Sequence, residues 1–186
     1  MKKLVFFASL LILATFVLVS CGKKEDPAPA PGTVSVNLPV NYTIKGVPST
    51  SGPKISADVS LKDLLAKSGN QDKENYVKAG VVSTSSTIKF TGITDTGATL
   101  SNITFSTDDN VIKDVKLIDS FSKQPLSLSR DTTLSMGELT YLNFLGQVST
   151  YIATKKKITL NVTYSIANSD IDNGKILLDI TSTFGW

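Results

Sequence analysis

The side chains that most often carry out enzyme chemistry are nearly absent from this sequence. Among 186 residues there is no histidine and only one cysteine, Cys21. Without histidine there is no imidazole base, no Ser-His-Asp triad and no histidine-ligated metal. A single cysteine excludes a disulfide within the chain, a thiolate zinc site and a CxxC redox pair. The formal net charge is only +3 and the lysines are scattered, so we do not expect a nucleic-acid-binding protein.

Carboxylates are the remaining candidates for catalysis, because two acids at a set separation can cleave a glycosidic bond. The aspartates lie mostly beside turns or on polar faces, and no acid is embedded in an apolar run where desolvation would raise its pKa. Gly-rich phosphate loops, GxSxG and Walker patterns are also absent. An acid-only hydrolase is therefore the weakest of the functions considered. We expect a protein that is not an enzyme and has no cofactor.

Alternating oxygen ligands and a late glycine occur in the segment 168–174, Asn-Ser-Asp-Ile-Asp-Asn-Gly. This spacing is similar to the first part of a calcium-binding loop, which continues with another oxygen ligand and a bidentate acid. Lys175 occupies the position of the next ligand, and Asp179 follows too early for the bidentate acid. We therefore interpret the segment as a polar hairpin turn and expect no metal site.

The first residues have the organisation of a secretory signal peptide. Lys2 and Lys3 form a basic start, and residues 4–19 are apolar except for one serine and one threonine. This run is at the long end for a secretory signal and shorter than the roughly 20 residues that a spanning helix needs. Cleavage after Ser20 would remove both lysines and leave the mature chain close to neutral.

Leu18, Val19, Ser20 and Cys21 close the apolar run. They resemble the lipobox of bacterial outer-membrane lipoproteins, which has an aliphatic residue, a tolerant position, a small residue and an invariant cysteine. The resemblance implies that Cys21 receives a diacylglycerol thioether, that the chain is cut before it, and that the new amino terminus is acylated. Two or three acyl chains, at about 0.8 kcal/mol per buried methylene, anchor a protein stably without a transmembrane helix. The alternative is an uncleaved anchor helix with a chance cysteine.

Charged residues follow the cysteine. Lys24, Glu25 and Asp26 resemble the export signal of Bacteroidetes-type lipoproteins, a lysine followed by two acids, which implies delivery to the outer leaflet. The other interpretation is a solvated charged tether. Proline and alanine alternate next, which predicts an extended, polyproline-like spacer. We divide the sequence into a signal peptide (1–20), a lipidated cysteine with its tether (21–32) and a single domain (33–186).

Alternating apolar and polar residues predict strands through most of the domain. The clearest runs over residues 33–46, with Val34 to Ile44 on the buried face and Pro39 on the polar face, as expected of an edge strand or a bulge. Residues 61–68 should form a short helical turn. We expect the last two strands to form a hairpin that turns at Asp172-Asn173-Gly174. The further strands are predicted at 55–61, 77–82, 87–91, 99–105, 111–118, 158–166 and 176–186.

One longer amphipathic helix is predicted after Ser135-Met136-Gly137-Glu138, which has the spacing of a capping box. Lys155-Lys156-Lys157 should end it, since cations suit the negative end of the helix dipole. Aromatic residues on its apolar face usually pack into the core, although they could instead line a groove for sugar or peptide. That face consists of Tyr141, Phe144, Leu145, Val148, Tyr151 and Ile152, which fall within an arc of about 120°.

These elements predict a mainly β protein, an antiparallel β-sandwich of immunoglobulin-like type with one amphipathic helix packed on it. An eight-stranded outer-membrane barrel is the alternative architecture, but most of the predicted strands are shorter than the roughly 9–11 residues needed to cross lipid. We expect a lipid-anchored protein of the cell envelope, either periplasmic or surface-exposed. Its role should be that of a non-catalytic binding module for a glycan, a peptide or an envelope partner. The alternative is a structural or accessory subunit of an outer-membrane assembly.

Overall fold

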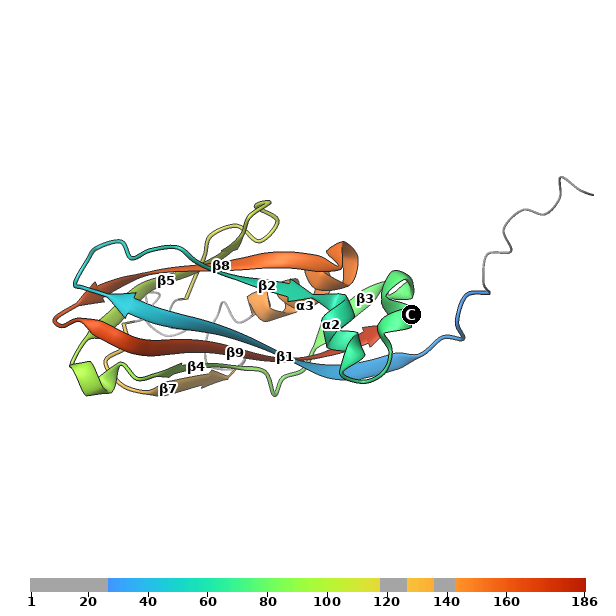
Figure 1. Cartoon of the computed structure of the whole chain (residues 1–186), viewed down its shortest axis with the longest axis horizontal. Coiled ribbons are helices and arrows are strands. Elements are labelled where there is room, and N and C mark those ends of the chain that lie inside the picture. The colour runs from blue at the N-terminus through green and yellow to red at the C-terminus, as the bar shows by residue number, and fades with distance from the viewer. Residues whose placement is uncertain (1–26, 118–126, 136–142) are drawn as a thin grey trace, which may run out of the picture.

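A computed structural model of the chain describes residues 27–117, 127–135 and 143–186. These residues form two antiparallel β-sheets that lie face to face as a sandwich (Figure 1). The prediction of a mainly β sandwich carrying a helix is therefore confirmed. In the first sheet the order is β1 (Thr33–Gly46), β9 (Ile171–Gly185), β4 (Thr87–Thr91) and β7 (Thr132–Ser135), and β3 (Ala79–Val82) also pairs with β9. In the second sheet the order is β2 (Ile55–Ser60), β8 (Lys157–Ala167), β5 (Thr99–Thr107) and β6 (Val115–Lys116).

The helices lie at the margins of the sandwich. Short α2 (Leu61–Ala66) begins directly after β2, with Ser60 as its N-cap: the Ser60 hydroxyl accepts a hydrogen bond from the amide of Asp63. The 3₁₀ helices are η1 (Gln71–Tyr76) and η2 (Thr94–Thr96). The described part of α3 (Asn143–Lys155) packs against β3 and the adjacent ends of β8 and β9. None of the helices in these ranges is long and apolar enough to cross a membrane.

The core lies between the two sheets and the inner face of α3. Strict alternation places the apolar side chains of β1, β8 and β9 inward, as their period of two requires. Phe105 of β5 stacks on Phe144 of α3, with ring centroids 4.8 Å apart. Gly80 of β3 allows the close approach of the helix, because a Cβ at this position would lie 2.4 Å from the Ser149 carbonyl oxygen.

Lys156 connects the end of α3 to the rest of the fold. Its backbone is left-handed, with φ of 68°, and its carbonyl accepts a hydrogen bond of 2.7 Å from the amide of Leu61. Its ammonium group donates to the carbonyls of Ala153 and Val77, at 2.6 and 2.7 Å. The cation therefore satisfies a terminal carbonyl of α3 and joins the helix to the segment that leads into β3. The sequence predicted a cation at this end of the helix, but not its contact with Val77.

The predicted C-terminal hairpin is wrong. β8 and β9 belong to different sheets, so the chain crosses from one sheet to the other between them. The chain reverses before β9, where Asn168 adopts a φ of 75°. Gly174 instead lies within β9 opposite Ile44, where a Cβ would approach the Cγ2 of Ile171 to 2.9 Å. Close packing, and not a turn, accounts for this glycine.

Smaller differences concern strand lengths. The predicted strand at 111–118 is only two residues long within the described range, as β6, because a turn after β5 places Asn110 at a φ of 57°. The short strand β7 was not predicted. Leu61 belongs to α2 and not to the preceding strand, since Ser60 caps the helix there.

Candidate functional site

Several sequence-predicted residues lie outside the described residues. These are the signal peptide, Leu18, Val19, Ser20 and Cys21 of the lipobox, Lys24, Glu25 and Asp26, residues 136–138 of the capping box, and Tyr141. The lipidation site and the export signal therefore stay predictions from sequence.

The described part of the helix face settles where its aromatic residues lie. Phe144 is fully buried and Tyr151 is 6% exposed, in one cluster with Leu145, Val148 and Ile152. This confirms that the described part of the stripe is core, as aromatics on an apolar helix face usually are. The opposite face, with Asn143, Gln147, Thr150 and Thr154, is exposed.

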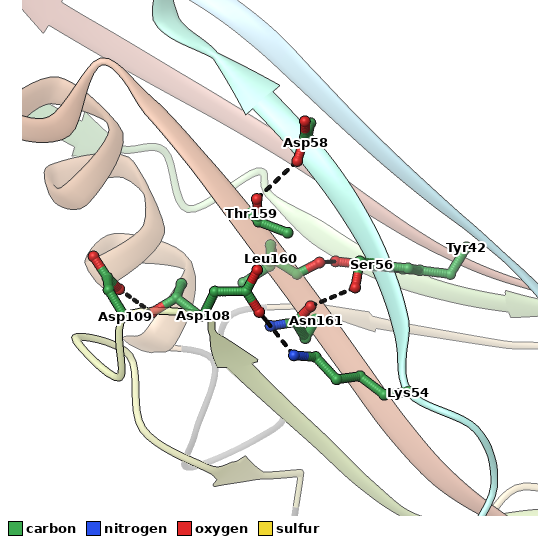
Figure 2. Close-up of polar contacts among 10 residues, drawn as sticks. Tyr42, Lys54, Ser56, Asp58, Asp108, Asp109, Thr159, Leu160 and Asn161 are labelled. Carbon is green, nitrogen blue, oxygen red and sulfur yellow. Dashed lines mark hydrogen bonds and ion pairs between the residues drawn. The ribbon is translucent and has the colours of Figure 1, made fainter.

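Asp58 and Asp108 lie on the outer face of the second sheet (Figure 2), close enough to interact electrostatically, and we therefore compare them with a catalytic pair of carboxylates. Asp108 accepts hydrogen bonds from Lys54 Nζ at 2.7 Å and from Asn161 Nδ2 at 2.8 Å. Asn161 in turn accepts a bond of 2.6 Å from the Ser56 hydroxyl. The Lys54 bond, followed by that of Asn161, lowers the pKa of Asp108.

Asp58 is held in a similar way. It accepts a hydrogen bond of 2.7 Å from Thr159 and lies 3.0 Å from Lys157 Nζ, and these contacts lower its pKa. A glycosidase needs one carboxyl whose pKa is raised, so that it stays protonated and can act as an acid. Asp58 and Asp108 have the opposite property. We interpret this cluster as a cross-strand polar network that stabilises the sheet surface.

The segment 168–174 does not form a ligand shell in the structure. The side-chain amide of Asn168 donates to the hydroxyl of Thr99 at 2.8 Å, and Asp172 and Gly174 lie within β9. Among the described ranges, no three or more His, Cys, Asp or Glu side chains come together in a way that could hold a metal ion.

A groove of about 730 Å³ lies between the polar face of α3 and the loop after β5. We call it the α3 groove; it is lined by Val111 and Ile112 of the loop and by Asn143, Gly146, Gln147, Thr150, Tyr151 and Thr154 of the helix. Every described lining residue is uncharged.

A second cavity of about 190 Å³, which we call the Lys155 recess, is lined by Thr107, Asp108, Asp109, Tyr151, Lys155, Lys157, Ile158 and Thr159.

The loop that forms one wall of the α3 groove is held by a compact hydrogen-bond network. The buried hydroxyl of Thr107 donates to Asp109 at 2.9 Å and accepts from the amide of Ile112 at 3.0 Å. Asp109 also accepts from the amide of Val111 at 3.3 Å. The backbone is thus fixed while the side chain of Val111 remains 55% exposed. Val111 is thus an exposed apolar side chain at a fixed position in the wall that faces the polar side of α3.

Tyr151 lies at the junction of the two cavities, since it lines both. Its ring is packed in the core, and Lys155 Nζ lies 5.9 Å from the ring centroid. Its hydroxyl has no hydrogen-bond partner among the described residues. Sequence periodicity identified Tyr151 as core, but it could not show that this residue also lines a groove, because the other wall of the α3 groove comes from residues about forty positions earlier.

Among the described strands β1 pairs on one side only, with β9, and its other edge, which we call the free edge, is a second surface of interest. Gly32 and Trp186 exchange backbone hydrogen bonds, and the register is constant from Thr33 to Ile44, so even-numbered residues of β1 bond to β9 and odd-numbered residues face the open edge. Pro39 is odd-numbered, so it removes no ladder bond. The position of β1 at the end of the described strand order confirms it as an edge strand. A cavity of about 310 Å³ separates its middle from β2 and α2.

Comparisons with known proteins give no family. No protein-family model matches the chain, and no curated protein matches it. Among solved structures, one titled "Desmodium yellow mottle tymovirus" has a TM-score of 0.34 at 9% identity, covering 88% of this chain and 95% of that one. A structure of the infectious bursal disease virus Gt strain has a TM-score of 0.30 at 11% identity, covering 86% of this chain and 34% of that one. With TM-scores below 0.5, these matches support no inference about function.

Proposed function

We propose that the protein is a lipid-anchored, non-catalytic binding module of the bacterial cell envelope, and that its ligand binds in the α3 groove. The ordered signal that ends in Leu18-Val19-Ser20-Cys21 supports the anchor, and Lys24-Glu25-Asp26 supports delivery to the outer membrane. The observation that carries the binding role is the groove itself. It combines a fixed, exposed Val111 with a row of uncharged polar side chains on α3.

Cosedimentation tests this function. The Cys21→Ser chain, in nonionic detergent, would be mixed with lipid-extracted envelope fragments, so that binding is measured without the anchor. Val111→Lys should abolish sedimentation with the fragments, because it places a charge in an uncharged groove. Val47→Lys is the matched control: Val47 is also exposed, at 63%, and does not line the α3 groove. Equal sedimentation of Val111→Lys and the parent would show that the groove is not the site.

A structural subunit is the second candidate, and the unpaired edge of β1 is the observation that favours it, because such an edge can pair with a strand of another protein. Two features oppose it. Pro39 interrupts the row of amide donors, and α2 lies beside the middle of the strand, where Asp63, Leu64 and Lys67 line the same cavity as Pro39.

The same assay separates the two functions. Asn41→Pro removes an amide donor from the free edge without removing a ladder bond to β9, whereas Asn41→Ala keeps that donor. If a partner strand binds this edge, Asn41→Pro should lose sedimentation while Asn41→Ala and Val111→Lys retain it. The binding-module proposal predicts that both Asn41 variants behave as the parent does.

A further inference from the structure

On the basis of the proposed function, we infer that the α3 groove binds an uncharged oligosaccharide, held by the hydroxyl of Tyr151 and the side-chain amides of Asn143 and Gln147. The groove, the burial of Tyr151 and the distribution of charge around them carry this inference.

Tyr151 provides a fixed hydrogen-bonding group. Its side chain is 6% exposed, so the ring is held by the core and its position costs little further entropy when a ligand binds. Its hydroxyl is both a donor and an acceptor, and it has no partner among the described residues. The hydroxyl is not among the described polar atoms that are sealed in the core without a partner, and Tyr151 lines the groove, so this group is suited to bind a ligand hydroxyl.

Asn143 and Gln147 extend this polar surface along the helix. They are four residues apart on α3, so they lie on one face, and both are exposed. Neither side-chain amide has a hydrogen-bond partner in the part of the chain that the structure describes. Each amide presents donors and an acceptor, which is the combination that sugar hydroxyls require.

The remaining lining residues contribute shape and apolar contact. Thr150 donates to the carbonyl of Gly80 at 3.3 Å, and Thr154 donates to the carbonyl of Tyr151 at 2.9 Å, so their donors are already used within the protein. Val111 supplies an exposed apolar side chain opposite the helix, on which the C–H face of a sugar ring can lie.

The distribution of charge favours an uncharged ligand. The described lining of the α3 groove contains no Lys, Arg, Asp or Glu. The charged residues near Tyr151 belong to the Lys155 recess, where Asp108 and Asp109 lie beside Lys155 and Lys157. Lys157 is paired with Asp58 at 3.0 Å, and the remaining cation of the recess, Lys155, is accompanied by the two carboxylates of Asp108 and Asp109, which would oppose an anionic group. An acidic glycan therefore gains little in this region and loses hydration.

The geometry favours a glycan over an extended peptide. Extended peptides are commonly bound by main-chain hydrogen bonds to a free sheet edge. Such an edge exists at β1, whereas in the helix wall of the α3 groove the amides from Gln147 onward are bonded within the helix, so that this part of the wall offers side chains only. Recognition by side-chain amides and a phenol suits a ligand that carries many hydroxyl groups.

Affinity electrophoresis tests the inference. The full chain, in a polyoxyethylene detergent, would run through native gels that contain amylopectin, mannan or an uncharged β-glucan, and through gels that contain polygalacturonate. At least one uncharged polysaccharide should retard the parent, and 0.5 M salt in the binding step should not abolish the interaction. Tyr151→Phe, which keeps the ring, should weaken retardation about tenfold, and Gln147→Ala should weaken it as well.

Matched controls keep the test specific. Tyr76→Phe and Asn41→Ala make similar changes at residues that do not line the groove, and both should be retarded as the parent is. An unchanged melting temperature for Tyr151→Phe would show that the loss is local. The inference is overturned if no uncharged polysaccharide retards the parent, if only polygalacturonate does, if a peptide ligand proves to occupy the groove, or if Tyr151→Phe binds normally. If cosedimentation still depends on Val111 in those cases, the proposed function stands and only the ligand class is wrong.

Discussion

At the scale of single residues, two buried tyrosines join the sheets in reciprocal directions. Tyr42 of β1 donates to the carbonyl of Leu160 in β8 at 3.0 Å, and Tyr164 of β8 donates to the carbonyl of Lys45 in β1 at 3.4 Å. Figure 2 includes the first of these contacts. Burial raises the pKa of both phenols, far above 10 for Tyr42. Both hydroxyls therefore stay protonated in the folded protein at pH values where a free tyrosine ionises.

This burial predicts how stability depends on alkaline pH. Because the pKa of Tyr42 is higher in the folded state, its contribution to the free energy of unfolding is fully present below about pH 10 and is lost as the pH rises above that value. The loss should approach about 1.4 kcal/mol per pH unit. Urea unfolding at pH 9 to 11.5 measures it. Tyr42→Phe should cost about 1 kcal/mol at pH 7 and show a shallower decline above pH 10. An identical decline in both proteins would mean that Tyr42 ionises freely in the folded state.

At the scale of elements, α3 has separate roles on its two faces. The inner face closes the core between β3 and the second sheet, and the outer face forms a wall of the α3 groove. Phe144 and Leu145 belong only to the packed face, and Asn143 and Gln147 belong only to the groove, whereas Tyr151 contributes to both, so substitutions at the first four residues can separate the two faces.

Substitutions on the inner face should unfold the protein. Leu145→Ala should cost about 2–5 kcal/mol and Phe144→Ala about 3–5 kcal/mol, by lost burial and a cavity, since both side chains are fully buried. Against a typical total of about 5–15 kcal/mol, either change should lower the melting temperature of the purified full chain by many degrees. Asn143→Ala on the outer face is the control and should change stability little. If Phe144→Ala melted as the parent does, its stacking on Phe105 would not contribute to the core.

The elements also show what the sequence could and could not predict. The alternation of apolar residues in β1 and the helical spacing of apolar residues in α3 were sufficient to predict which faces are buried, because both patterns are local properties of the sequence. Pairing is not local: the apolar alternation of β8 and β9 is the same whether they form a hairpin or lie in opposite sheets. The α3 groove was missed for a related reason. Its helix face was identified as solvent-facing, but only the fold brings Val111 next to it.

At the scale of the whole molecule, the start of the domain is tied to its C-terminal strand. The amide of Gly32 donates to the carbonyl of Trp186 at 3.2 Å, and the indole of Trp186 donates to the carbonyl of Ala30 at 3.1 Å. The described part of the tether leaves the sandwich at the end of its long axis, beside the C-terminus (Figure 1). An anchor at Cys21 would therefore hold the domain by one end, with its length directed away from that end.

The proposed lipid anchor at Cys21 and the proposed export signal at Lys24-Glu25-Asp26 can be tested by separate substitutions. Cys21→Ser should abolish labelling with a fatty-acid probe and release the chain from its lipid anchorage, because the acyl chains supply the membrane affinity. Changing Lys24, Glu25 and Asp26 together to alanine should leave the label intact, since the lipobox is unchanged, but should hide the domain from protease added to intact cells. Each variant is the control for the other. Label on Cys21→Ser would rule out this cysteine as the lipid attachment site, whereas equal digestion of the triple variant and the parent would reduce Lys24-Glu25-Asp26 to a charged tether.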